Sequence, residues 1–282
     1  MTENQNFEMQ NPLFEKTPAA TAKRLLASQS FLFVVIFQII SLVFSVITAF
    51  GNKGLFSALM QEAEILNESL DDTLIEILEA LQPYIVVMNN ALLTISFITL
   101  IPTFLLTLGL AFMHFGAKKN DDKMAANGAY IASIFSAINL IVPIFYILVM
   151  ILVGVIVIAF EPDAMSALIV TILILSVPFI FAIIYHSKLI DTLIGLRNTL
   201  KTGIHACKVY SYVIVLNWIA AVLNLISGFG AMTNNIFGAV STILSAVALI
   251  IINLKLSDYK HAEGVPEFED MKRAKEAVRN MK

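Results

Sequence analysis

The sequence predicts an all-α integral membrane protein, a bundle of six transmembrane helices, and three observations support this fold class. Hydrophobic residues make up 58% of the 282 residues and charged residues 14%, whereas a soluble domain has roughly 45–50% apolar and about 25% charged residues. Six stretches are apolar over about 20 residues or more, which is the length that crosses a bilayer. The basic residues gather in the segments that would lie on one side of such a bundle.

The six predicted spans are separated by polar segments that carry the charges of the chain. They run over about Phe31–Phe50, Ala91–Met113, Gly128–Phe160, Met165–Tyr185, Tyr210–Phe229 and Ile236–Leu254. The third span is too long for a helix perpendicular to the membrane, so we expect it to tilt, to kink at Pro143 or to project beyond the bilayer. Dividing it into two spans would invert all that follows and place four basic residues outside, against the charge rule: Lys188, Arg197, Lys201 and Lys208.

The distribution of basic residues predicts the orientation. With the N-terminus inside, only Lys53 of the 18 Lys and Arg residues lies outside, as expected for cytoplasmic loops rich in Lys and Arg. We therefore expect both termini in the cytosol. The polar first thirty residues lack the pattern of a cleaved signal peptide, so the first span is expected to be an uncleaved anchor. This topology fits a bacterial plasma membrane, and an organelle membrane is the alternative.

The predicted organisation has three parts: a cytosolic N-terminal segment (1–30), a six-span membrane domain (31–255) and a charged cytosolic tail (256–282). Within the membrane domain, residues 55–82 have the pattern of an external acidic amphipathic helix, expected to pack on the bundle or on a partner. Residues 188–203 form a second amphipathic segment with leucines on one face and basic residues on the other, expected at the cytoplasmic interface.

The first and fifth spans resemble each other without gaps. Gln38 aligns with Asn217, Ser45 aligns with Asn224, and a Phe-Gly pair closes both segments. This pattern predicts three parallel helical hairpins, unlike the inverted repeats of many secondary transporters. Apolar segments also resemble each other through composition alone, so both explanations stay open.

The six predicted cores contain no Asp, Glu, Lys or Arg, whereas proton relays and voltage sensors use ionisable groups at membrane depth. Their polar residues are amides and hydroxyls: Gln38, Ser41, Ser45, Asn139, Ser176, Asn217, Asn224, Ser241, Ser245 and Asn253. Gln38, Asn139, Asn217 and Asn224 are the candidate site residues. They are interpreted either as interhelical contacts or as the lining of a polar cavity for a neutral or zwitterionic solute.

Small residues recur every four positions on two spans. On the third span these are Gly128, Ala132 and Ser136, together with Ala125, Ala129, Ser133 and Ala137. On the sixth they are Gly238 and Thr242, with Ser241 and Ser245. Such faces allow helices to approach closely, and the partner helix can belong to the same chain or to another.

The sequence lacks the patterns of catalytic, cofactor and metal sites. The four histidines are scattered, no H-E-x-x-H pair or Gly-rich phosphate loop occurs, and Cys207 is the single cysteine. No basic patch with interleaved aromatic residues suggests a nucleic-acid partner. We therefore expect no enzyme, no cofactor and no metal site.

The function predicted from the sequence is that of a multi-pass membrane protein, most simply a non-enzymatic scaffold or accessory subunit. Its expected partners are the lipid bilayer and either another membrane protein or further copies of this chain. The alternative is a transporter or permease component for a neutral or zwitterionic small solute.

Overall fold

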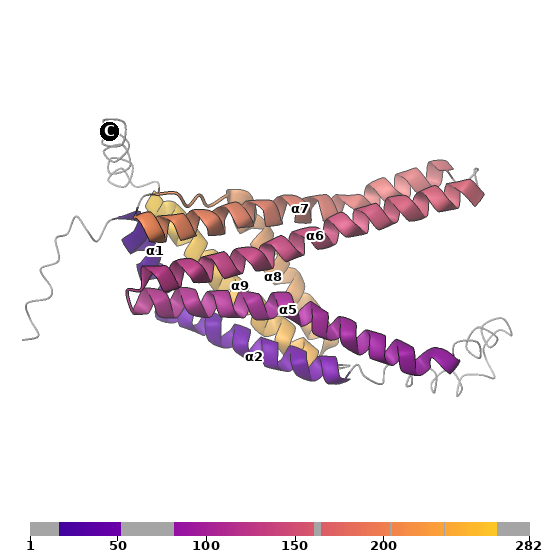
Figure 1. The fold of residues 1–282 in the computed structure, drawn as a ribbon, viewed down its shortest axis with the longest axis horizontal. Coiled ribbons are helices and arrows are strands. Elements are labelled where there is room, and N and C mark those ends of the chain that lie inside the picture. Colours follow the sequence, from indigo (N-terminus) through magenta and orange to yellow (C-terminus); the bar gives the residue numbers. More distant parts are fainter. Residues whose placement is uncertain (1–16, 52–81, 161–164, 204, 234, 264–282) are drawn as a thin grey trace, which may run out of the picture.

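The structure, a computed structural model, describes residues 17–51, 82–160, 165–203, 205–233 and 235–263. In these ranges there is no strand, and six helices are long and apolar enough to cross a membrane. They are α2 (Gln29–Gly51), α5 (Ile85–Lys118), α6 (Asp122–Phe160), α7 (Met165–Thr202), α8 (Ser211–Ala231) and α9 (Ile236–Glu263). The predicted six-span, all-α membrane architecture is confirmed (Figure 1).

Two short elements complete the described fold: helix α1 (Pro18–Leu26) precedes α2, and the 3-10 turn η3 (Gln82–Tyr84) precedes α5. Helix α1 lies within the N-terminal segment that is predicted only as polar. Its start follows local rules, because Thr17 accepts a hydrogen bond from the Ala20 N–H at 3.1 Å and Pro18 occupies the first turn. A search for long apolar spans overlooks a short helix of this kind.

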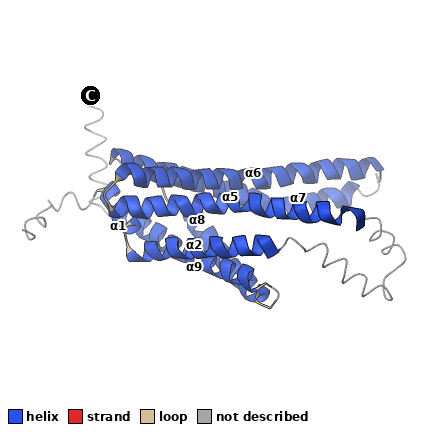
Figure 2. Ribbon diagram, turned by 60° about the horizontal axis from the view of Figure 1, so that its bottom comes forward, coloured by secondary structure: helices blue, strands red, loops and turns tan. Residues whose placement is uncertain are grey.

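The spanning helices form an arc in which each helix packs on its neighbours (Figures 1 and 2). The order along the arc is α7, α6, α5, α2, α9 and α8, and α7 also contacts α8. The partners of the three expected hairpins, α2 with α5, α6 with α7 and α8 with α9, therefore lie side by side. In Figure 1 the α6–α7 pair diverges from α2, α8 and α9 toward one end of the molecule.

Helices α6 and α7 are longer than a bilayer requires. They contain 39 and 38 residues, which corresponds to about 58 Å each, against roughly 30 Å for the hydrocarbon core. Pro143 lies inside α6 without dividing it, so the third predicted span is one helix. A helix of this length must tilt or project beyond the bilayer.

Small residues bring α5 and α6 into close contact. A Cβ atom added to Gly109 would lie 2.8 Å from the Gly128 carbonyl oxygen, and one added to Gly116 would lie 2.4 Å from the Ala125 backbone nitrogen. At such distances the backbones must move apart, so glycine is what allows the helices to approach. The predicted small-residue face of the third span therefore packs on α5 of the same chain.

The described basic residues gather at one end of the bundle, which we call the basic end. They lie in α1, in the parts of α5, α7 and α9 toward their C-terminal ends, and near the N-terminal ends of α6 and α8: Lys23, Arg24, Lys118, Lys119, Lys123, Lys188, Arg197, Lys201, Lys208, Lys255 and Lys260. Helix α1 lies at this end in contact with α5, α7 and α9. Lys23 of α1 pairs with Asp122 of α6 at 2.5 Å, and the Arg197 guanidinium lies 4.6 Å from the centre of the Tyr130 ring.

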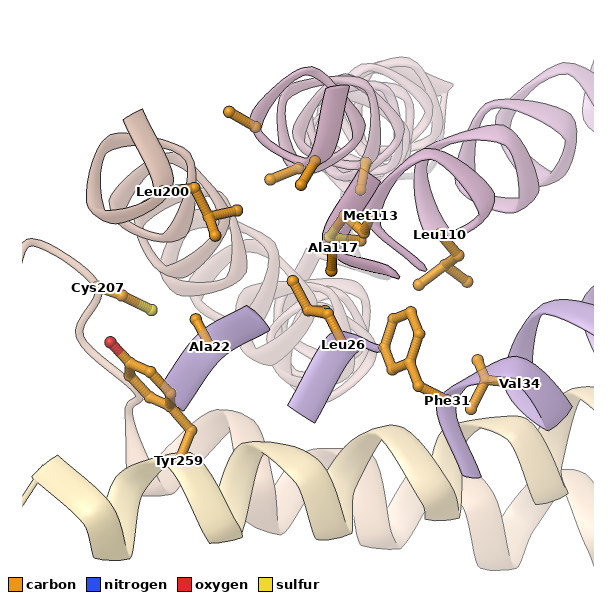
Figure 3. Close-up of a cluster of buried hydrophobic side chains, with 14 of the residues drawn as sticks. Ala22, Leu26, Phe31, Val34, Leu110, Met113, Ala117, Leu200, Cys207 and Tyr259 are labelled. Atoms are coloured by element: carbon orange, nitrogen blue, oxygen red, sulfur yellow. The ribbon is translucent and has the colours of Figure 1, made fainter. Parts of the chain in front are cut away.

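Buried apolar side chains hold the basic end together (Figure 3). Leu26 of α1, Met113 of α5, Leu200 of α7 and Tyr259 of α9 all belong to this cluster. His114 of α5 is buried beside it, with Nδ1 2.8 Å from the Leu26 carbonyl oxygen. Because these residues come from both sides of the arc, the cluster joins the two halves of the bundle.

The segment 188–203 differs from the expected helix at the membrane interface, because α7 continues through it to Thr202. Leu193 and Leu196 pack against the buried cluster, and Leu200 is only 1% exposed. The apolar face therefore packs on protein rather than on lipid. The sequence shows that this face is apolar but does not show that α1 and α9 cover it.

The connection from α7 to α8 runs back along α7 after a turn at Gly203, whose φ is +68°. Thr199 Oγ1 accepts hydrogen bonds from the Ala206 and Cys207 N–H groups at 3.0 and 2.9 Å. A Cβ on Gly195 would lie 2.5 Å from the Ala206 carbonyl oxygen. Glycine at that position therefore permits the close approach of the connection to the helix.

Two predicted elements lie outside the described residues. These are the external acidic helix, of which only the end near residue 82 is described, and the charged tail after residue 263. Before that point α9 extends beyond Leu254, the predicted end of the sixth span, as far as Glu263.

Candidate functional site: a hydroxyl-lined chamber

Four serines join α2 to α9, and we call them the serine cluster: Ser41, Ser45, Ser241 and Ser245. The Ser41 hydroxyl donates to the Ser241 carbonyl oxygen at 3.1 Å, and the Ser241 hydroxyl donates to the Ser41 carbonyl oxygen at 3.0 Å. Ser41 Oγ lies 2.8 Å from both Ser241 Oγ and Ser245 Oγ, and Ser45 Oγ lies 2.8 Å from Ser241 Oγ. The cluster thus satisfies its own polar groups inside the bundle.

A cavity of about 310 Å³ adjoins the serine cluster between α2, α5 and α9, and we call it the chamber. Its lining residues include seven with hydroxyl groups: Ser45, Thr48, Ser96, Thr99, Thr103, Ser241 and Thr242. Ala49, Leu100 and Gly238 are the other described lining residues, and none of the lining residues that the structure describes is charged. The chamber lies near the last turns of α2 and the first turns of α9, toward the end opposite the basic end.

The hydroxyls of the chamber differ in whether they already have a partner. Thr99 donates to the Ser96 carbonyl oxygen at 2.8 Å, and Thr242 donates to the Gly238 carbonyl oxygen at 2.9 Å, both within their own helices. Thr48 Oγ1 is buried and has no hydrogen-bond partner among the described residues. Leaving such a group unsatisfied costs about 1–3 kcal/mol. Because this oxygen is buried, the polar surface that the chamber offers to water or a polar solute comes from the other lining hydroxyls.

The candidate residue Asn217 belongs to a separate hydrogen-bond network that joins α7, α8 and α9. The Tyr185 hydroxyl donates to Asn217 Oδ1 at 2.6 Å, and Asn217 Nδ2 donates to Asn253 Oδ1 at 3.3 Å. Asn253 Nδ2 in turn donates to the Ile214 carbonyl oxygen at 3.0 Å. Asn217 and Asn253 are 2% and 1% exposed and do not line the chamber, so their geometry is that of interhelical contacts.

The other three candidate residues lie elsewhere. Gln38 is buried on the face of α2 that continues to Ser41. Asn139 of α6 is half-buried and donates to the Phe135 carbonyl oxygen of its own helix at 3.0 Å. Asn224 is half-buried on α8, about two turns beyond Asn217. The structure does not bring the four candidates together, and none of them lines the chamber.

Five chamber residues are absent from the core polar groups selected by sequence: Thr48, Ser96, Thr99, Thr103 and Thr242, the last of which is named only in a small-residue face. A signal for them exists in the spacing of hydroxyl residues. Ser96, Thr99 and Thr103 recur at i, i+3 and i+7 on α5, which places them on one helix face. Thr48 extends the row that Ser41 and Ser45 begin on α2. What the sequence does not give is that these faces of α2, α5 and α9 meet.

A smaller cavity of about 110 Å³ lies at the basic end, and its lining is almost entirely apolar. It is bounded by α1, α5, α7 and α9, with Leu25, Phe31, Leu193 and Leu256 among its walls. In the described part of the chain no group of His, Cys, Asp and Glu side chains could hold a metal ion. Of these two cavities, the chamber is the polar one.

Comparisons with known proteins give no match to a protein-family model, to a curated protein or to a solved structure. The fold defines the class of the chain as a multi-pass, α-helical membrane protein.

Proposed function

We propose that this chain is a non-enzymatic transporter or permease component that binds a small neutral polar solute in the chamber. The observation that carries the proposal is the convergence of seven hydroxyls from three spans on one cavity of about 310 Å³. Sequence reasoning favoured a scaffold because amides and serines in membrane helices commonly join helices to one another. That role fits Asn217, but it leaves the buried, unpartnered hydroxyl of Thr48 unexplained.

The neutral character of the proposed solute follows from the chamber lining. None of the described residues that line the chamber carries a charged side chain, and burying a charge without a partner is costly. A full ionic charge in the chamber would therefore lack a counter-charge. Hydroxyl dipoles, in contrast, are well suited to the hydrogen bonds of an uncharged solute.

The proposal includes an orientation. The basic end would face the cytosol, because cytoplasmic segments carry excess Lys and Arg, and both termini would lie there. The chamber would then open toward the outer side of a bacterial plasma membrane. Attaching a fluorescent reporter to either terminus tests this orientation, and an external signal from either fusion would contradict it.

Solute entry into proteoliposomes tests the proposed activity. Vesicles with the purified protein are mixed with isotonic glycerol, urea or acetamide, and swelling is followed by stopped-flow light scattering. At least one probe should enter faster than into empty vesicles. The double variant Thr48→Val/Thr99→Val should lose this excess rate, while Thr94→Val, at an exposed threonine outside the chamber, should keep it. Rates equal to those of empty vesicles with folded protein would oppose transport of these probes.

A scaffold or accessory-subunit function is the second candidate, and the α6–α7 pair favours it. Beyond Pro143 this pair carries apolar side chains that are largely exposed, such as Leu148 and Leu152 at 60% each and Ile174 at 65%. Cysteine cross-linking in native membranes tests this function, with Leu152→Cys introduced into a Cys207→Ser background. A discrete cross-linked homo-oligomer or heteromer would support it, and a strictly monomeric species would oppose it.

A further inference from the structure

We infer that the chamber selects its solute by hydrogen-bond donors, and that the solute is an uncharged primary amide or urea-type molecule. This inference rests on the proposed function and names the chemical class of the solute. The reason is that most hydroxyl hydrogens of the chamber already have acceptors, whereas oxygen lone pairs remain free to accept. Each hydroxyl has one hydrogen to donate and two lone pairs that accept.

The serine cluster uses its own donors. The Ser41 and Ser241 hydroxyls donate to each other's backbone carbonyl oxygens. Either oxygen can donate in the three 2.8 Å contacts between hydroxyls. We assign Ser45 as donor to Ser241 Oγ and Ser245 as donor to Ser41 Oγ, and one of the Ser41 and Ser241 hydrogens is then shared with the facing hydroxyl oxygen. In this assignment all four hydrogens have acceptors within the cluster. Ser45 and Ser241 therefore present oxygen lone pairs, and no free hydrogen, to the chamber.

The walls of the chamber repeat this pattern. Thr99 and Thr242 donate to backbone carbonyl oxygens of their own helices, so their remaining hydrogen-bonding capacity is that of acceptors. Within the described residues, the Ser96 and Thr103 residues accept hydrogen bonds only at their backbone carbonyl oxygens, so their hydroxyls keep a hydrogen to donate. The Thr48 hydroxyl is unpartnered but buried. Accepting lone pairs therefore outnumber free hydrogens among the chamber hydroxyls.

An acceptor-rich, uncharged site favours a particular kind of molecule. Primary amides and ureas carry two or more N–H donors around one carbonyl oxygen, and that oxygen can accept from the few free hydroxyls. N-methylation removes the donors while keeping the acceptor. A site that hydrogen-bonds a donor discriminates strongly against the analogue lacking it, because its own polar groups are then left unpaired.

The inference is tested on the full-length protein by asking whether a solute protects a cysteine in the chamber from a thiol reagent. Ser96→Cys, in a Cys207→Ser background, places one thiol in the chamber lining. Its reaction rate with the neutral reagent methyl methanethiosulfonate is measured in detergent with increasing acetamide, N,N-dimethylacetamide or potassium chloride. Thr94→Cys in the same background is the matched control, because Thr94 lies two residues away on α5, is exposed and does not line the chamber.

We expect acetamide to slow the modification of Ser96→Cys at least threefold and in a saturable way. N,N-dimethylacetamide should not slow it. Neither amide should change the modification rate of Thr94→Cys. Equal protection by both amides would overturn selection by donors and leave the proposed solute site standing. Protection by potassium chloride alone would overturn the neutral-solute class in favour of a cation. Absence of protection by every probe, with both variants folded, would overturn the inference and count against the proposed function.

Discussion

Ser41 of α2 and Ser241 of α9 exchange hydrogen bonds, each hydroxyl donating to the backbone carbonyl oxygen of the other residue at 3.1 and 3.0 Å. The two residues are 200 positions apart in sequence, so this exchange joins the first and last spans of the chain. It also forms one side of the chamber, because Ser241 contributes to the chamber lining. The contact that holds the helices together and the candidate site therefore share a residue.

Removing either hydroxyl should weaken this interface. We expect Ser41→Ala and Ser241→Ala each to lower the free energy of unfolding by about 0.6 kcal/mol, with an upper range near 1.7 kcal/mol, as for other interhelical polar contacts in membranes. The double variant should be less destabilised than the sum, because both changes remove the same exchange. Equilibrium unfolding in mixed micelles measures these values, with the exposed Ser227→Ala as the control. Strict additivity would contradict the pairing.

Gly116 should not tolerate a methyl group. A Cβ at this position would lie 2.4 Å from the Ala125 backbone nitrogen, so Gly116→Ala should force α5 and α6 apart and cost about 1–3 kcal/mol. Gly230→Ala is the matched control, because a Cβ there has no neighbouring atom within 4 Å. Alanine is the better helix former, so the control should be neutral or stabilising. Thermal unfolding of both variants makes the comparison, and equal stability would exclude the close helix approach.

The amide network should contribute to stability and not to solute binding. Asn217→Leu leaves the Tyr185 hydroxyl and Asn253 Oδ1 without their partner, and we expect a loss of about 1–2 kcal/mol. Asn224→Leu, on the same helix but half-buried, should cost less. Both variants should retain solute entry in the proteoliposome assay. Loss of entry in a well-folded Asn217→Leu protein would assign the binding role to the amide instead of to the chamber.

The single cysteine reports on the connection between α7 and α8. Cys207 is 2% exposed, and its N–H donates to Thr199 Oγ1 at 2.9 Å. Thr199→Val removes that acceptor and also the one used by Ala206, so the connection should open more often and Cys207 should react with a neutral thiol reagent about tenfold faster. Thr202→Val, at an exposed position on the same helix, should react like the wild type. An unchanged rate in Thr199→Val would show that Thr199 does not hold the connection.

The membrane architecture was predictable because it depends on local properties of the chain. Each span is an uninterrupted apolar stretch, and the helices of the structure cover all six predicted spans. Small residues at helical spacing indicate a close helix contact at Gly128, although the sequence does not identify Gly109 of α5 as its partner. Helix α1 was missed because it is short and has the mixed composition of a surface segment.

The chamber was not predictable from the sequence because no single residue of its lining is unusual in a membrane helix. Buried amides such as Asn217 attract attention since an unsatisfied amide in hydrocarbon is costly. Thr99, in contrast, satisfies its own hydrogen on the preceding turn, so it looks unremarkable in any membrane helix. Only the packing of α2 against both α5 and α9 turns these residues into a common lining. The local periodicity of the sequence does not indicate which helices pack on one another over such long separations.

Thermal unfolding of the detergent-purified protein, screened against neutral and zwitterionic small solutes, tests the chamber as a binding site most directly. A ligand that binds only the folded state raises its stability by RT ln(1 + [L]/Kd), about 1.4 kcal/mol at ten times Kd. The account predicts that at least one donor-rich neutral solute raises Tm in the wild type and in Asn217→Leu, but not in Thr48→Val/Thr99→Val. An equal rise in the double variant, or no rise with any solute in well-folded protein, would contradict it.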